Sequence, residues 1–212
     1  MLFKNKDYVE YCIRAAKLIE DNKDYISDLD AATGDGDHWA NMNMGFQKIV
    51  DSAEELKTLS YADLFKKLGM IMMSTIGGSS GALYGSSYIS AAKAIGDREN
   101  LNISALNDVL AALLEGICKR GNSGAGMKTM IDTLYAASEE MKAAVAEGAG
   151  DREALERLEK AAERGMESTK DMPAVRGRAY YQADKGIGHL DPGAVTMYYQ
   201  IKTLAECMME KC

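Results

Sequence analysis

The sequence predicts an all-α fold, an antiparallel up-and-down barrel or bundle of eight helices. Apolar residues recur at helical spacing along most of the chain, no segment shows convincing strand alternation, and the 212 residues include only two prolines. Short polar or glycine-rich stretches connect the expected helices, as is usual between antiparallel neighbours. The length is typical of one domain, so residues 1–212 are expected to form a single nucleotide-binding unit if the loops described below have that function.

The first five helices are expected within residues 6–119. Residues 6–27 and 39–57 should form the first two. The third, over residues 61–76, places Leu64, Leu68 and Ile71 on one face, and Ser60 followed by Asp63 resembles a capping box. The fourth is expected over residues 80–95. The fifth, over residues 104–119, repeats the apolar stripe with Leu106, Val109, Leu110, Leu113 and Ile117.

Three further helices complete the expected bundle. Residues 128–146 and 151–170 are expected to form the sixth and seventh. The eighth, over residues 192–209, keeps its apolar stripe for four turns, and it begins with Asp191 as N-cap and Pro192 at the first helical position.

Composition limits the classes of partner. A net charge of −7 disfavours nucleic acid and anionic membranes, since both select a basic surface. The first seven residues are too charged for a signal sequence, and no apolar run is long enough to span a bilayer, so a cytoplasmic location is expected. The four cysteines match no zinc spacing and are expected to be reduced thiols.

Four connections carry unusual residues and should meet at one end of the bundle. They span residues 28–38, 77–81, 120–127 and 172–191, and they follow the first, third, fifth and seventh expected helices. In an up-and-down array, connections that are one helix pair apart emerge at the same end. An acidic loop, two glycine-rich loops and a long basic loop should therefore converge.

The acidic loop is the most informative of the four. Asp30, Asp35 and Asp37 lie within eight positions of one another, with Gly34 and Gly36 between them. Crowded carboxylates repel unless a cation or a raised pKa removes the repulsion, and glycine lets the backbone turn tightly around an ion. Magnesium held by a few carboxylates usually completes its shell with phosphate oxygens. The loop therefore predicts a hard-cation site and suggests a nucleotide.

Two other interpretations of this loop do not match its residue spacing. No frame that starts at Asp28, Asp30 or Asp35 has the glycine and glutamate spacing of an EF-hand. An aspartyl phosphatase would place its acids after a buried β-branched strand, which is absent before Asp35. A solvated surface turn stays open as the alternative.

The remaining loops suit an anionic ligand. Residues 77–81, Gly-Gly-Ser-Ser-Gly, precede a helix whose exposed amides could receive a phosphate, although such stretches are often plain turns. The segment 172–191 is basic, with Arg176, Arg178 and Lys185 in an otherwise acidic chain. The guanidinium fork suits phosphate oxygens, and connections of this length are often functional.

Four spaced motifs resemble the nucleotide-binding L subunit (DhaL family) of dihydroxyacetone kinase. They are residues 29–38, Leu-Asp-Ala-Ala-Thr-Gly-Asp-Gly-Asp-His; residues 77–85, Gly-Gly-Ser-Ser-Gly-Ala-Leu-Tyr-Gly; residues 128–130, Lys-Thr-Met; and residues 188–194, Gly-His-Leu-Asp-Pro-Gly-Ala. They occur in order from residue 30 to residue 194, which makes chance agreement implausible.

The resemblance implies an eight-helix barrel with a nucleotide-diphosphate pocket at one end and two Mg²⁺ bound to the phosphates. Carried over by position, the metal ligands are Asp30, Asp35 and Asp37. No catalytic side chain is assigned with certainty, and Arg178 is a candidate charge stabiliser. The residues expected to contact ADP or ATP are His38, Trp39, Ala40, Asn41, Ser79, Ser80, Gly121, Met130, Arg178, Asp191, Pro192 and Gly193.

The chain departs from the family pattern at three positions. Trp39 stands where glycine is usual, Met127 replaces an aspartate before Lys-Thr-Met, and Ala82 replaces a common proline. Trp39 could stack on the adenine or cover the mouth of the pocket. Met127 suggests a different course for residues 120–127.

The resemblance also implies partners. In the phosphotransferase-dependent enzyme of this family, bound ADP relays a phosphoryl group from an M subunit to dihydroxyacetone on a K subunit, and a homodimer of the L chain is expected. An ATP-dependent two-chain triose kinase would use the same residues, and the sequence does not separate the two. The nucleotide-binding domain of fatty-acid kinases is disfavoured by His38. A nucleotide-loaded regulator of a transcription factor is the non-enzymatic alternative.

Overall fold

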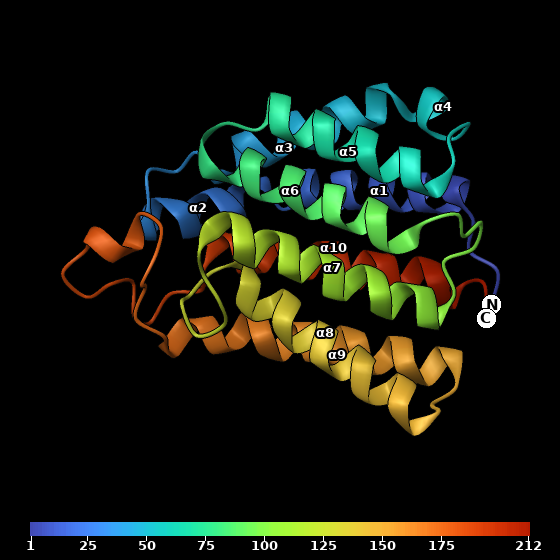
Figure 1. The fold of residues 1–212 in the computed structure, drawn as a ribbon. Helices are drawn as coiled ribbons and strands as arrows, with labels where there is room; N and C mark the ends of the chain where they lie inside the picture. The colour runs from blue at the N-terminus through green and yellow to red at the C-terminus, as the bar shows by residue number, and fades with distance from the viewer.

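The computed structural model describes residues 1–212 and contains helices but no strands, which confirms the predicted all-α class. The ten α-helices form an elongated bundle (Figure 1). Their bounds are α1 Asn5–Asp21, α2 Lys23–Thr33, α3 His38–Asp51, α4 Ala53–Leu56, α5 Tyr61–Thr75, α6 Gly78–Ile95, α7 Ile103–Gly121, α8 Met130–Glu147, α9 Asp151–Ser168 and α10 Pro192–Met209, with short 3-10 turns at Thr169–Asp171 and Ala179–Tyr181.

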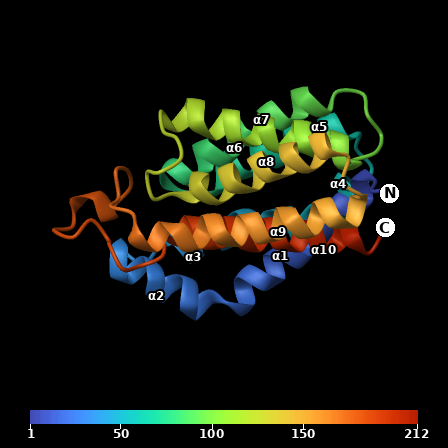
Figure 2. The same cartoon turned by 90° about the horizontal axis from the view of Figure 1, so that it is seen from below.

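Two of the expected helices are each divided in the structure. The segment expected over residues 6–27 breaks at Asn22, whose side-chain amide donates to the carbonyl oxygen of Leu18 at 2.8 Å and so competes with helical hydrogen bonding. The segment expected over residues 39–57 breaks at Ser52. Figure 2 shows that α2 leaves the direction of α1 and turns toward one end of the bundle. The break at Asn22 therefore positions the acidic end of α2.

From α5 to α10, helices that follow one another in sequence lie side by side and run in opposite directions (Figure 1). The closest pairs are α5 with α6, α6 with α7, and α8 with α9, while α10 packs against α9, α8 and α1. Both chain termini lie at one end of the bundle, and the four unusual connections lie at the other (Figures 1 and 2). The alternation expected from the sequence places these connections together.

One continuous hydrophobic core extends along the bundle. A cluster of buried aromatic rings, Tyr8, Tyr61 and Phe65, fills the end near the termini, with the Tyr8 and Phe65 ring centroids 4.9 Å apart in an edge-on arrangement. Glycines allow the helices to approach closely: a Cβ on Gly116 would lie 2.9 Å from the backbone oxygen of Ser86. None of the helices combines the length and apolar composition needed to cross a bilayer.

Candidate functional site

A cavity of about 680 Å³ opens at the end of the bundle that lies away from the termini. This volume is in the range of small-molecule sites in proteins. Every one of the four unusual connections contributes to its wall. Its lining includes Asp30, Asp35, Asp37, His38, Asn41, Gly77, Ser79, Ser80, Gly121, Lys128, Met130, Arg178, Asp191, Pro192 and Gly193.

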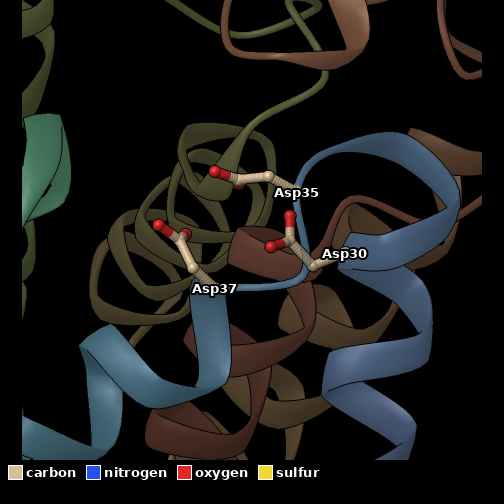
Figure 3. A group of neighbouring side chains, drawn as sticks. All are labelled: Asp30, Asp35 and Asp37. Atoms are coloured by element: carbon tan, nitrogen blue, oxygen red, sulfur yellow. The ribbon is translucent and has the colours of Figure 1, made fainter.

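Three carboxylates gather on one wall of this cavity. Asp30 comes from the last turn of α2, Asp35 from the connecting loop, and Asp37 from the residue before α3 (Figure 3). One oxygen from each side chain lies within 4.8 Å of the other two. We term Asp30, Asp35 and Asp37 the acidic cluster. Its spacing lets one small divalent cation contact all three side chains, and carboxylate oxygen is the donor that Mg²⁺ prefers.

Backbone geometry fixes the buried member of the acidic cluster. Asp30 is 8% exposed, and its Oδ2 accepts the backbone N–H of His38 at 2.9 Å, which ties the end of α2 to the start of α3. A Cβ at Gly34 would lie 2.5 Å from Oδ1 of Asp30, so no larger residue fits there. Gly36 has φ +76°, a left-handed conformation that glycine adopts without strain. The two glycines therefore serve the tight turn, as the sequence predicts.

Four helices begin at the cavity and direct their N-terminal amides toward it. These are α3, α6, α8 and α10, and each contributes lining residues from its first turn. Helix N-termini carry partial positive charge and attract anions. Asp30 accepts the His38 N–H at the start of α3, Thr129 caps α8 and Asp191 caps α10, whereas no side chain caps α6, which starts after Gly77. The amides at the start of α6 are therefore the ones best placed to receive phosphate oxygens.

A half-buried histidine, His38, lies beside the acidic cluster. Nε2 of His38 is 3.0 Å from the hydroxyl oxygen of Thr196, which itself donates to the carbonyl oxygen of Gly193. Burial lowers the pKa of His38, although Asp30 and Asp37 oppose this shift. A neutral ring that donates from Nε2 matches the hydroxyl, which accepts there because its own hydrogen goes to Gly193. His38 therefore links the first turn of α3 to the first turn of α10.

The segment between α9 and α10, residues 169–191, covers the cavity, and we term it the lid. Figure 1 shows it projecting beyond the ends of the helices. Arg178 forms an ion pair with Asp35, with Nη2 and Oδ2 2.6 Å apart. Gln182 donates to the carbonyl oxygen of Ala32 at 3.0 Å, and Arg176 donates to that of Asn122 at 2.8 Å. The lid thus crosses from the acidic loop to the glycine-rich loop after α7.

Two of the residues expected at the site lie outside the cavity lining. Trp39 and Ala40 follow His38 on α3, where successive residues differ by 100° around the axis, so His38 and Asn41 face the cavity and the two residues between them do not. The indole packs against the core, with the ammonium of Lys23 5.9 Å from its centroid. The expectation that Trp39 covers or stacks within the pocket is not supported by its position.

Four further residues line the cavity that were not predicted to do so from the sequence. Lys128 and Arg120 line the cavity, as do Thr33 and Ser123. Lys128 stands in the recognised Lys-Thr-Met motif, and this was the available signal. Its burial, at 2% exposure, was not predictable because lysine is seldom buried.

Asp191 is expected to make the stability of the nucleotide-free chain depend on pH. Burial raises the pKa of Asp191 to about 7, against the opposing effects of the Ala194 N–H and Lys128. Between about pH 4 and 7 the folded state keeps a proton that the unfolded chain releases, so stability falls as pH rises through this window. We expect Asp191→Asn, which keeps an N-cap, to remove about 2 kcal/mol of this loss between pH 5 and 7. Urea unfolding in EDTA measures it, and equal pH slopes in both proteins would contradict it.

The fold and the site together define an all-helical protein with a cavity at one end of a bundle and three clustered carboxylates in its wall. A family model for the DAK2 domain matches residues 32–206. The chain belongs to the DAK2-domain family.

Curated relatives match most of the chain. The PEP-dependent dihydroxyacetone kinase 1 ADP-binding subunit DhaL of Listeria innocua is 40% identical over 176 residues, 83% of each chain. The corresponding subunit of Escherichia coli is 32% identical over 205 residues, 97% of this chain and 98% of the relative. These comparisons confirm the resemblance seen in the sequence and the assignment to a family of kinase subunits.

A solved structure shares the fold. The dihydroxyacetone kinase of C. freundii, in complex with AMP-PNP and Mg²⁺, superposes with a TM-score of 0.70 and 25% identity, covering 93% of this chain and 33% of that one. The chain thus corresponds to about a third of the longer C. freundii protein.

Proposed function

We propose that this chain is a single-domain ADP-binding subunit of a dihydroxyacetone kinase, with Mg²⁺ and nucleotide in the cavity described above. The observation that carries the proposal is the convergence of the acidic cluster, the uncapped start of α6 and Arg178 on one cavity. Two relatives that match over most of their length are named ADP-binding subunits, and the C. freundii relative was solved with AMP-PNP and Mg²⁺.

We propose that the acidic cluster binds Mg²⁺ at the diphosphate, with two ions as the family resemblance implies. Asp30 keeps Oδ1 free of hydrogen bonds while Oδ2 holds the His38 amide, so the cluster is both rigid and able to bind metal. Bound Mg²⁺ would supply charge neutralisation at the phosphate oxygens. This neutralisation explains how a chain with net charge −7 could hold an anionic nucleotide.

The chain's own residues would bind and orient the phosphates. The amides of Ser79 and Ser80 lie in the first turn of α6, where the helix dipole favours an anion. Arg178 reaches the acidic cluster from the lid and carries a charge that could stabilise a transferring phosphoryl group. Lys128 adds a second cation to the wall. Phosphoryl transfer depends mainly on such positioning and charge.

The finer proposal is a phosphoryl relay. A phospho-donor M subunit would load the bound nucleotide, and a K subunit that holds dihydroxyacetone would accept the phosphoryl group, with the L chain acting in the cytoplasm. Support comes from the Escherichia coli and Lactococcus lactis relatives, which are named PEP-dependent and PTS-dependent kinases. Neither histidine is assigned as a phosphoryl acceptor, because His38 is held against Thr196 and the exposed His189 does not line the cavity.

The test of the relay is nucleotide retention. We expect the purified chain to release ADP on denaturation, and the native chain to exchange labelled ATP slowly. A cavity that purifies empty and exchanges labelled ATP rapidly would instead support an ATP-dependent two-chain kinase. A stable complex with a transcription factor, without turnover alongside any K-type partner, would support the regulator alternative.

A further inference from the structure

Lys128 is the only lysine or arginine that the structure buries, at 2% exposure. It precedes the N-cap of α8 and has φ +59°, a left-handed conformation that is uncommon for residues other than glycine. A buried ammonium is costly unless hydrogen bonds compensate for the lost water. The hydrogen bonds that the ammonium makes therefore explain why a lysine can be buried at this position.

The Lys128 ammonium contacts both ends of the lid. Nζ donates to the carbonyl oxygen of Thr169, where the lid leaves α9, and to that of His189, just before the lid enters α10. Burial lowers the pKa of Lys128, and Asp191 is the foremost of the carboxylates that oppose this shift. The same side chain thus joins two points that are 20 positions apart in sequence.

Two further hydrogen bonds join the ends of the lid beside this ammonium, and we term these ends, residues 169–170 and 188–191, the neck. Gly188 N–H donates to the carbonyl of Lys170 at 2.8 Å, and Asp191 N–H donates to the Thr169 hydroxyl at 3.1 Å. The lysine stem is also packed: a Cβ on Gly186 would lie 3.1 Å from Cε of Lys128. The neck therefore packs around the stem of Lys128 and is hydrogen-bonded to its ammonium.

We propose that Lys128 is a positioning residue that fastens both ends of the lid to the start of α8 and thereby holds Arg178 over the acidic cluster. Without the ammonium, the His189 carbonyl loses its donor, the Thr169 carbonyl keeps only the Met172 N–H at 3.3 Å, and the two ends of the lid lose their shared contact. The contacts farther along the lid, Gln182 to Ala32 and Arg178 to Asp35, then hold a segment whose ends are no longer fixed.

The first test is hydrogen exchange of the nucleotide-free chain in EDTA, followed by NMR at the Gly188 and Asp191 amides. We expect Lys128→Met, which keeps the length of the stem, to speed exchange at both amides by about tenfold or more, because charge-assisted hydrogen bonds hold the neck. Lys170→Met is the matched control, since this lysine is exposed and only its backbone takes part in the neck. Wild-type exchange at both amides in Lys128→Met overturns the proposal.

A second pair of variants leaves Lys128 intact, in case its replacement prevents folding. Gly186→Ala should loosen the same neck, because its Cβ would lie 3.1 Å from Cε of Lys128, 3.2 Å from Cβ of Ala179 and 3.3 Å from Cγ2 of Thr33, and its φ is +69°. Gly177→Ala has the same backbone strain, at φ +72°, but its Cβ meets nothing within 4 Å. We expect faster neck exchange in the first variant only. Equal exchange in the two variants contradicts a role for the contact with Lys128.

A third measurement connects the lid to the site and rests on the proposed function. We expect a fluorescent ADP analogue, loaded with Mg²⁺, to dissociate about tenfold faster from Lys128→Met than from Lys170→Met, since a loosened lid no longer covers the ligand. A loosened neck with unchanged dissociation overturns the claim that Lys128 positions the lid for the site. If the wild-type chain binds no analogue, the proposed function fails while the exchange result still decides the role of Lys128.

Discussion

Asp37→Asn is expected to lower nucleotide affinity in the presence of Mg²⁺ by at least about 100-fold, because the loss of even an outer-shell partner of a metal ligand typically costs 10- to 100-fold. Asp37 lies before α3 and joins Asp30 and Asp35 in the acidic cluster. The amide of asparagine keeps the shape of the side chain but removes the charge that attracts the cation. Isothermal titration with ADP and Mg²⁺ measures the change.

Two comparisons make the result on the acidic cluster specific. Asp28→Asn removes an exposed carboxylate from the same helix as Asp30, outside the acidic cluster, and should leave affinity unchanged. Asp35→Asn should weaken binding like Asp37→Asn, while it also frees Arg178 from its 2.6 Å ion pair. Helicity by circular dichroism should stay at the wild-type level in all three. Wild-type nucleotide affinity in Asp37→Asn would rule out the metal assignment.

Gly165→Ala is expected to lower the free energy of unfolding by about 3 kcal/mol, the upper part of the usual range for overpacking. Gly165 lies on α9, where an added Cβ would stand 2.6 Å from the backbone oxygen of Asp132 and 2.9 Å from Cα of Thr133 on α8. These are backbone atoms, so relief requires the two helices to separate. The better helix propensity of alanine, about 1 kcal/mol, offsets only part of this cost.

Thermal unfolding should show this destabilisation as a lower Tm, by about 6–12 °C for a chain of this size. The control is Gly124→Ala, since a Cβ there meets nothing within 4 Å and its φ is not left-handed. We expect Tm of the control within a degree or two of wild type. The prediction fails if both variants unfold at the same temperature.

Gly165→Ala should also change the shape of the cavity. Asp132, whose carbonyl the new methyl group would meet, uses its side chain to accept the backbone N–H groups of Gly126 and Thr129. A shift of α8 therefore moves the loop before α8, which forms part of the cavity wall. The packing of α8 against α9 and the shape of the cavity are linked through this one residue.

The sequence predicted much of the fold because helical periodicity and capping are local signals. Asp191 as N-cap and Pro192 at the first position of α10 are found as predicted, and so is Ser60 as N-cap of α5. The break at Asn22 was missed, since an asparagine within an apolar stripe interrupts a helix only when its side chain finds a competing partner such as the Leu18 carbonyl.

The sequence also predicted which end of the bundle carries the site, but not which residues of α3 face it. The alternation of helix direction predicted that the four unusual connections meet, and the cavity is lined by all of them. The position of Trp39 was not predictable from its neighbours His38 and Asn41, because which arc of α3 faces the cavity depends on how α3 packs against α1 and α5. Contacts between distant helices set this rotation, and periodicity alone does not.

By itself, the sequence determined the helical class, the acidic loop and the family resemblance, because each depends on residues close together in the chain or on motifs in a fixed order. Only the tertiary structure decided that Lys128 is buried between the two ends of the lid and that Arg178 pairs with Asp35. Those contacts join positions 41 or more residues apart, and they form only because the bundle brings the starts of four helices and one long connection to the same end.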